Sequence, residues 1–329
     1  MSTDQTSKDR VDHLAALFRS DVLELTLLPT EDCNLRCRYC YEHKADRRMS
    51  PQTVEAIKLL ISRRAPTLRH LRLGWFGGEP LMARDLVLDI SRFAVRQRRE
   101  NPALDVQGGL STNGTLLTPE LAGQLIAVGM DTFQVSLDGP PEYHDLVRVD
   151  RFGGGSFSRI WGNLVALHDT DIPFQVNLRL HLSPTNRHLL GDFVEWICMH
   201  LGGDERFRLF FKALAPLGGE LDRETDYFTP EEQLRLRSQL DAQLAGRMGS
   251  TSPALAGYVC YAARPTAFVI RADGSIVKCT VGLEDPANQI GRLLPDGSMD
   301  LDQTAFRRWV RGAAVLDQEA MRCPRNSLI

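Results

Sequence analysis

Strand-like and helix-like segments alternate over the first two thirds of the chain, and this alternation constrains the fold more than any other feature. Apolar runs are separated by segments with helical spacing, the first of which follows Ser50-Pro51, a capping serine and a proline at the first helical position. Such alternation predicts parallel βαβ units with right-handed crossovers. Six units predict an α/β fold with a partial (β/α)6 barrel. Strands are expected at 22–28, 70–76, 105–111, 132–137, 174–182 and 207–214, and further helices at 84–99, 119–128, 157–168 and 188–201.

The chain changes character after Pro216, which predicts a second, smaller unit. Its 329 residues exceed the ~250–300 at which a single core usually stops growing. Thr229-Pro-Glu-Glu232 predicts the capped start of a helix that runs to about Leu244, and 246–253 has the composition of a linker. Asp273-Gly274 between apolar residues predicts a β-hairpin. The expected parts are an N-terminal segment at 1–20, the barrel at 21–215, a helical linker at 216–257 and a small C-terminal domain at 258–329.

Composition excludes several classes of protein. The chain has 39 Lys and Arg against 42 Asp and Glu, which gives a net charge of −3 and no reason to expect a nucleic acid or a membrane surface as partner. The first residues lack the apolar core of a signal peptide, and no apolar run approaches the ~18 residues of a membrane span. We therefore expect a cytoplasmic location, where cysteines are more often metal-binding or catalytic than disulfide-bonded.

Three cysteines lie in the loop after the first expected strand, in the string Cys33-Asn-Leu-Arg-Cys37-Arg-Tyr-Cys40. A loop with this spacing can wrap around one metal cluster. Three thiolates on a four-iron cluster leave one iron open to a small chelating molecule. A structural zinc site usually has four protein ligands, and His43 is the only nearby candidate for a fourth. The string therefore favours an iron–sulfur site that activates a substrate or cofactor.

With an aromatic residue before its third cysteine, this string resembles the signature of the radical S-adenosylmethionine (SAM) superfamily. The segment 75–81 (WFGGEPL) resembles the one that receives the methionyl amino group of SAM, and 111–114 (STNG) and 136–139 (SLDG) resemble the ends of later barrel strands. The segment 140–157 is similar to the branch with a C-terminal SPASM or twitch extension. That branch includes anaerobic sulfatase-maturating enzymes and radical SAM peptide maturases.

The resemblance implies a 4Fe–4S cluster and SAM as cofactors, and an external electron donor of the flavodoxin or ferredoxin type. Cys33, Cys37 and Cys40 would hold the cluster, and reductive cleavage of SAM would give a deoxyadenosyl radical that abstracts hydrogen from the substrate. Because the carboxyl ends of barrel strands share one face, the four segments should converge. The implied SAM-binding residues are Tyr39, Gly77, Gly78, Glu79, Ser111, Asn113, Ser136, Arg148, Asn177, Arg179 and Leu214. For Asn177, Arg179 and Leu214, ordinary packing within the strands remains an alternative.

Cys260, Cys279 and Cys323 resemble the first half of the auxiliary-cluster pattern of twitch and SPASM domains. They are fewer than a full SPASM domain carries, so the resemblance implies one auxiliary 4Fe–4S cluster with its fourth iron site open. Cys198 lies in an apolar helical run and is expected in the core. Thr280 stands where sulfatase-maturating members carry an aspartate after the hairpin cysteine, which disfavours sulfatase maturation.

These features favour a radical SAM oxidoreductase that abstracts hydrogen from a peptide or protein side chain, as in cross-linking or oxidation during maturation of ribosomal peptide natural products. The alternatives are a radical SAM dehydrogenase or epimerase acting on a small molecule, and a non-catalytic metal-binding module. The stretch before Cys33 is too short for a peptide-recognition domain, so a separate leader-binding protein is a further possible partner. Proton transfer is left open among Asp138, Glu142, His144, Asp145 and His181.

Overall fold

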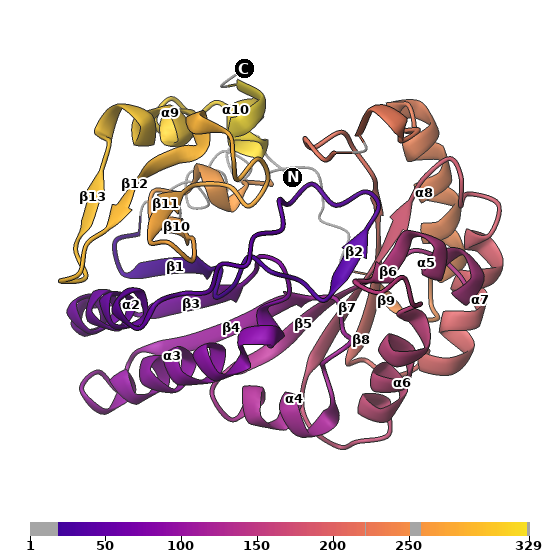
Figure 1. The fold of residues 1–329 in the computed structure, drawn as a ribbon, viewed down its shortest axis with the longest axis horizontal. Coiled ribbons are helices and arrows are strands. Elements are labelled where there is room, and N and C mark those ends of the chain that lie inside the picture. The colour runs from indigo at the N-terminus through magenta and orange to yellow at the C-terminus, as the bar shows by residue number, and fades with distance from the viewer. Residues whose placement is uncertain (1–18, 221, 251–257, 328–329) are drawn as a thin grey trace, which may run out of the picture.

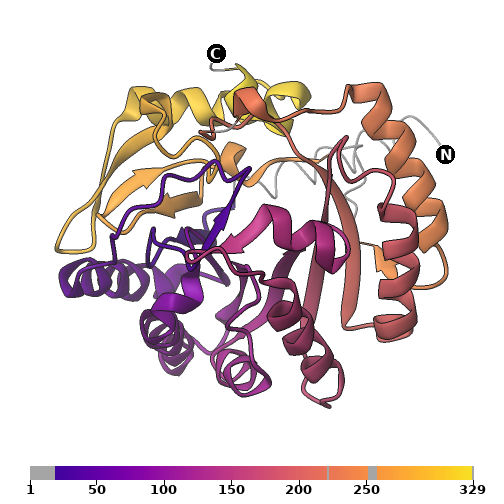
Figure 2. The same cartoon turned by 45° about the vertical axis from the view of Figure 1, so that its right-hand side comes forward.

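The computed structural model describes residues 19–220, 222–250 and 258–327. The six strands expected from the sequence are present, and each pairs in parallel with the next in space. They form a curved sheet with helices on its outer side (Figures 1 and 2). The fold is therefore α/β with a partial parallel barrel. The strands are β1 (Val22–Leu27), β3 (His70–Trp75), β4 (Asp105–Thr112), β5 (Met130–Leu137), β7 (Gln175–Leu182) and β8 (Phe207–Ala213).

Helices return the chain from the end of each strand to the start of the next. Two of them begin at capping residues, since the side chains of Ser50 and Thr118 accept backbone N–H groups ahead of a proline in the first turn, and the Ser50 cap was expected from the sequence. The helices that cover the outer side of the barrel are α2 (Pro51–Arg64), α3 (Arg84–Arg96), α4 (Pro119–Ile126), α6 (Phe157–His168) and α7 (Leu190–Leu201). Short 3₁₀ turns complete the connections at Ala65–Thr67, Pro80–Ala83, Gln97–Arg99 and Asp222–Glu224.

Strand alternation separates an apolar face from a polar face of the barrel. In β7, Val176, Leu178 and Leu180 are fully buried and belong to the main core cluster, together with residues of the outer helices. Asn177 and Arg179 point the opposite way because successive side chains alternate across a strand. The polar groups of the barrel strands are thus gathered on the inner face.

A small antiparallel pair beside the barrel was not expected from the sequence. β2 (Leu35–Cys37) lies in the cysteine loop and pairs with β6 (Arg148–Asp150), which follows the short helix α5 (Pro141–Val147). In this register Cys37 is directly opposite Arg148. The pairing therefore brings Arg148, one of the implied SAM-binding residues, next to a cysteine of the loop.

The C-terminal extension continues the barrel sheet. β10 (Ala267–Ile270) pairs in parallel with β1, and the hairpin expected at Asp273-Gly274 joins it to β11 (Ser275–Val277). Gly274 has φ of 80°, a left-handed conformation that favours glycine. The sheet in the described residues has eleven strands in the order β13-β12-β11-β10-β1-β3-β4-β5-β7-β8-β9. The remaining elements of the extension are β12 (Gln289–Leu293), β13 (Met299–Leu301), α9 (Gln303–Ala314), α10 (Gln318–Arg322) and 3₁₀ turns at Tyr261–Ala263, Pro286–Asn288 and Pro324–Ser327.

The segment between barrel and extension contains the expected helix. α8 (Pro230–Leu244) starts with the capping box of Thr229 and Glu232, and it packs beside α7 (Figure 2). The linker expected at 246–253 is partly a strand, because Gly249–Ser250 forms the short strand β9, which pairs with β8. Residues 251–257 lie outside the described residues. No helix of the described chain is long and apolar enough to cross a membrane.

Candidate active site

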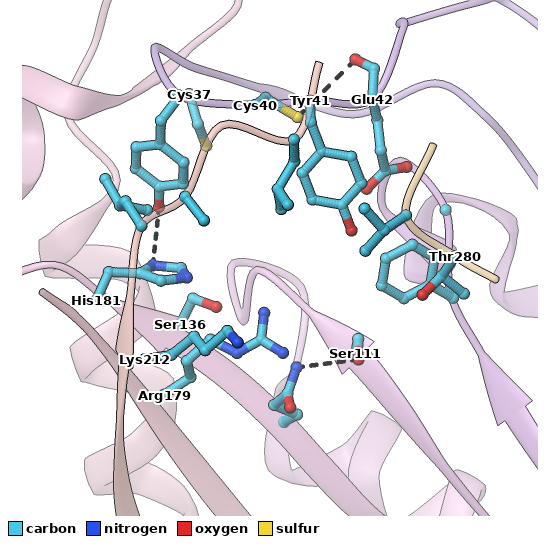
Figure 3. A pocket seen from close by; sticks show the side chains of 18 of the residues that line it. Cys37, Cys40, Tyr41, Glu42, Ser111, Ser136, Arg179, His181, Lys212 and Thr280 are labelled. Atoms are coloured by element: carbon cyan, nitrogen blue, oxygen red, sulfur yellow. Dashed lines mark hydrogen bonds between the residues drawn. The ribbon is translucent and has the colours of Figure 1, made fainter. Parts of the chain in front are cut away.

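A cavity of about 510 Å³ lies at the carboxyl ends of the barrel strands. Side chains from the cysteine loop form one wall, and Ser111, Ser136 and Arg179 project into the cavity from the sheet (Figure 3). Thr280 and its neighbours in the extension form the far side. Of the residues named from the sequence, the structure places these on the cavity wall: Cys33, Cys37, Tyr39, Cys40, Gly77, Gly78, Ser111, Asn113, Ser136, Arg148, Arg179, His181, Leu214, Cys260, Cys279 and Cys323.

Hydrogen-bond donors surround the thiols of the cysteine loop. The Cys33 sulfur accepts from the Leu35 amide at 3.4 Å and from Asn113 Nδ2 at 3.7 Å. Lys44 Nζ lies 2.7 Å from the Cys40 sulfur. Such donors stabilise thiolates that bind iron and tune the potential of the cluster they hold. The donor set and its surroundings therefore fit an iron–sulfur cluster.

Burial opposes ionisation of the Cys33 and Cys37 thiols in the apo protein. It raises the pKa of Cys33 and raises the pKa of Cys37 to about 12. A metal that binds here must displace the thiol protons, because only thiolates are ligands. Cluster assembly at this loop is therefore expected to release protons.

A buried polar network holds Tyr39 of the cysteine loop against the barrel. The Tyr39 hydroxyl donates to Asp138 Oδ2 at 2.7 Å and accepts from Arg148 Nη1 at 2.6 Å. His181 Nδ1 lies 2.7 Å from Asp138 Oδ1. Burial alone would raise the pKa of Asp138, but the neighbouring His181 and Arg148 outweigh it and hold that pKa well below its usual range. The network fixes the position of the loop that carries Cys37 and Cys40.

Glu79 lies behind the cavity wall and is fully buried. Its carboxylate accepts from the Asn113 amide at 2.6 Å, the Leu81 amide at 2.9 Å and the Thr112 hydroxyl at 2.8 Å. These bonds tie the end of β3 to the end of β4. The structure thus gives the carboxylate of Glu79 protein partners on both oxygens, and its contribution to the site is to position neighbouring segments.

We expect Glu79→Gln to lower the urea midpoint of unfolding of the reduced apo protein. The amide group of glutamine offers only one accepting oxygen, so a buried N–H loses its acceptor at a cost of ~1–3 kcal/mol. Glu205→Gln, at an exposed position, is the matched control and should stay within ~0.5 kcal/mol of the wild type. An unchanged midpoint for Glu79→Gln would contradict the structural role.

Gly77 and Gly78 allow the β3 loop to lie against the cysteine loop. Their φ angles are 82° and 27°, and a Cβ on Gly78 would lie 1.9 Å from the Asp32 carbonyl oxygen. The Gly78 amide donates to Glu42 Oε2 at 2.9 Å, and the Glu79 amide donates to the Asp32 carbonyl. These glycines therefore allow a close approach between two segments of the protein, the β3 loop and the cysteine loop.

The three cysteines of the extension line the same cavity as the cysteine loop. The Cys279 sulfur accepts from the Val281 amide at 3.3 Å, the same two-residue turn that Cys33 makes with Leu35. The donor chemistry again fits an iron–sulfur cluster. In the described chain no three His, Cys, Asp or Glu side chains are grouped as ligands of a single metal ion.

A buried ion pair joins the extension to the cysteine loop. Arg271 at the end of β10 contacts both carboxylate oxygens of Glu31 at 3.1 Å, and Arg47 adds a third contact at 3.0 Å. Glu31 and Arg271 are 4% and 8% exposed, and Arg271 also contacts Glu284 at 2.6 Å, so each buried charge has two partners of opposite sign. The pair fixes the two cysteine sets relative to each other.

Some residues named from the sequence lie away from the cavity. His144 is buried against Ser156, and Asp145 caps the start of α6 through the amides of Ser156 and Phe157. Burial and the charge of Arg148 lower the pKa of His144 to about 4. Glu142 is exposed on α5, Asn177 lines an adjoining hollow, and Cys198 is in the core as expected.

Several cavity residues were missed at the sequence level. Tyr41 and Lys44 lie just beyond Cys40. The only signal that could have found them is the length of the loop, which continues past the third cysteine and so keeps its next residues near the cavity. Lys212 belongs to an expected strand, but alternation alone does not say which of its faces meets a cavity. Tyr261 and Arg325 come from irregular parts of the extension that carry no periodic pattern.

The sequence of this chain matches a known protein family over the part that forms much of the site. The Radical SAM superfamily matches residues 27–197, more than half of the chain and the part that contains the cysteine loop and the barrel strands β3 to β7. This chain belongs to the radical SAM superfamily. Membership implies a 4Fe–4S cluster and SAM as cofactors.

Relatives within the radical SAM superfamily carry different activities. The chain is 29% identical to an AdoMet-dependent heme synthase of Nitratidesulfovibrio vulgaris, over 53% of this chain and 44% of the relative. It is 27% identical to a cysteine-type anaerobic sulfatase-maturating enzyme of Clostridium perfringens, over 66% of this chain and 59% of that enzyme. The chain covers less than two thirds of the length of both relatives.

Solved radical SAM structures share the fold. The native enzyme anSMEcpe, with bound AdoMet (SAM) and the Cp18Cys peptide, matches with a TM-score of 0.70 and 20% identity, over 92% of this chain and 86% of the other. Streptococcus suis SuiB bound to its precursor peptide SuiA matches with a TM-score of 0.62 and 14% identity, over 92% of this chain and 70% of SuiB. Because each match covers 92% of this chain, it reaches beyond the barrel strands.

Proposed function

We propose that this protein is a radical SAM oxidoreductase that modifies a side chain of a peptide or protein. The observation that carries the proposal is the position of two cysteine sets on one cavity, Cys33, Cys37 and Cys40 on one wall and Cys260, Cys279 and Cys323 on the other. A substrate bound between them would lie next to a source of radicals and a possible electron acceptor. The sulfatase-maturating relative and the peptide-bound structural neighbours support a peptide.

We further propose which residues hold the cofactors. The first cysteine set would bind the SAM-activating 4Fe–4S cluster, and the second would bind one auxiliary 4Fe–4S cluster with an open iron. Ser136 and Arg148 would bind SAM beside the first set, since both line the cavity and the buried Arg148 Nε has no hydrogen-bond partner, its nearest carboxylate oxygen being Asp138 Oδ2 at 3.9 Å. When bound, SAM and the reduced cluster supply a deoxyadenosyl radical that removes a hydrogen atom from the substrate. The electron would come from an external donor of the flavodoxin or ferredoxin type.

His181 is our candidate for the group that accepts a proton from the oxidised substrate. Removing a hydrogen atom and then an electron from a C–H group also releases a proton, which needs an acceptor. His181 lines the cavity, and Asp138 holds its Nδ1. Nε2 has no hydrogen-bond partner among the described residues, and burial lowers the pKa of His181, so the ring is neutral and able to accept. Thr280, which replaces an aspartate of the sulfatase-maturating members, donates or accepts only as a hydroxyl.

The test is turnover by the anaerobically reconstituted enzyme with SAM, a reductant and a short peptide encoded beside its gene. We expect deoxyadenosine to form and the peptide to lose the mass of two hydrogens for each oxidation or cross-link, both by mass spectrometry. Protein that carries iron but makes no deoxyadenosine would leave the non-catalytic alternative standing. A requirement for a second small protein in the same assay would identify the separate leader-binding partner.

A small-molecule substrate is the second candidate function. The relatives include an AdoMet-dependent heme synthase and, from Heliobacterium modesticaldum, a GTP 3′,8-cyclase, and the cavity volume suits a small ligand. Deoxyadenosine formation with an unchanged peptide, together with consumption of a metabolite from a desalted small-molecule extract, would favour this reading.

A further inference from the structure

Two cationic side chains lie side by side on the inner face of the barrel. Arg179 of β7 and Lys212 of β8 project into the cavity from neighbouring strands, close to Ser136 (Figure 3). The register pairs Arg179 with Phe210 and His181 with Lys212, so the two cations are diagonal neighbours on one face of the sheet. Both face the space between the two cysteine sets.

Neither cation is neutralised by the protein. Among the described residues neither side chain has a hydrogen bond or an ion pair to the protein, and Arg179 Nε is buried without a hydrogen-bond partner. Burial lowers the pKa of both groups, and the charge of Arg179 lowers that of Lys212 further. Two adjacent cations repel each other, and an anion bound between them would relieve that repulsion.

The carboxylates near the cavity are already engaged. Glu42 is the single carboxylate on the wall of the cavity within the described chain, and it accepts from the Gly78 amide. Among the other cations of the wall, Lys44 contacts the Cys40 sulfur and Arg148 donates to Tyr39, while Arg325 Nε is buried without a hydrogen-bond partner. The described wall therefore carries more Lys and Arg than Asp and Glu side chains, and Arg179 and Lys212 are the two cations that lie next to each other on adjacent strands.

We propose that Arg179 and Lys212 bind a carboxylate of the peptide substrate, an Asp or Glu side chain or a free C-terminus. The inference rests on the proposed function and names its substrate class as an acidic peptide. The planar fork of arginine suits both oxygens of a carboxylate, and the lysine adds a point charge beside it.

The experiment measures binding and needs no turnover. Reconstituted holoenzyme with SAM is titrated with the peptides Ac-Ala-Asp-Ala-NH2, Ac-Ala-Asn-Ala-NH2 and Ac-Ala-Asn-Ala with a free C-terminus, and binding is followed by paramagnetic broadening of the peptide proton signals. We expect at least one of the two anionic peptides to bind ~10-fold more tightly than the neutral one, the size of a charge-assisted pair. Whichever it is identifies the source of the carboxylate.

Variants of the pair complete the test. Lys212→Met and Arg179→Gln should abolish the preference for the anionic peptide, and the charge-retaining Lys212→Arg and Arg179→Lys should keep most of it. Equal binding of the three peptides, or a preference that survives both charge-removing variants, would overturn the inference. So would a loss of SAM affinity in Lys212→Met, which would assign the pair to SAM's own carboxylate. If a peptide is modified by the enzyme but the anion preference is absent, this inference falls and the proposed function stands.

Discussion

Replacing Cys37 by alanine is expected to remove about four iron atoms per chain and to reduce deoxyadenosine formation to the level seen without protein. Cys37 lies in β2, opposite Arg148, at the centre of the loop held by Tyr39 and its partners. Without its thiolate the loop offers two ligands, too few to retain the cluster that activates SAM. Iron content after anaerobic reconstitution and deoxyadenosine by chromatography are the measurements.

Cys198→Ala is the matched control for this prediction. It removes a cysteine from α7, where the side chain is 8% exposed and packed in the core, far from the cavity lining. This variant is expected to keep its iron and its activity and to lose stability by ~1–2 kcal/mol, because it deletes a small buried group. Full iron content in Cys37→Ala would contradict the assignment of the cysteine loop.

Replacing Cys279 by alanine is expected to separate the two cysteine sets. The iron content should fall from about eight to about four atoms per chain, because only the auxiliary cluster is lost. Deoxyadenosine should still form in the absence of peptide, because Cys33, Cys37 and Cys40 remain. Product formation should be abolished, since the cavity then lacks the electron acceptor that completes oxidation.

The result that would contradict this second prediction is specific. A Cys279→Ala protein that keeps about eight irons would show that the second set holds no cluster. A protein that loses half its iron but still converts peptide would show that the auxiliary cluster is dispensable for the chemistry. Cys37→Ala, measured in parallel, is the control for a general loss of folding. A misfolded protein would lose both clusters, whereas each variant is expected to lose a different one. The two clusters can be told apart because their electron paramagnetic resonance signals respond differently to SAM.

The barrel could be predicted from the sequence because each of its strands has a recognisable local pattern. Each is an apolar run long enough to be recognised, as in Val22–Leu27, and the intervening helices begin with clear capping residues such as Thr118. The hairpin at Asp273-Gly274 could be predicted for a similar reason, since the turn chemistry is local.

Elements that depend on distant partners could not be predicted. The three residues of β2 carry no periodicity, and the strand exists because β6 lies beside it. The parallel pairing of β10 with β1 is equally invisible to a local pattern, and through it the C-terminal extension continues the barrel sheet.

The site shows the same division. Cysteine spacing and the glycine pair are local signals, and they led to the residues that line the cavity. The sequence also grouped His144 and Asp145 with the candidates, but α5 turns one into the protein interior and uses the other as a helix cap. Lys212 was not named because a lysine on an expected strand does not by itself indicate a binding site. Its possible role becomes visible only when the neighbouring strand places Arg179 beside it.

The pairing of β1 with β10 has a consequence for how the protein is made. It joins strands about 240 positions apart, a separation that makes the contact late in folding. During synthesis β1 remains an unprotected sheet edge until the C-terminal third has left the ribosome, although the first cysteine set follows it directly. Insertion of iron into a fully walled site must therefore follow release of nearly the whole chain, so truncation before β10 should yield a barrel prone to association through its exposed edge.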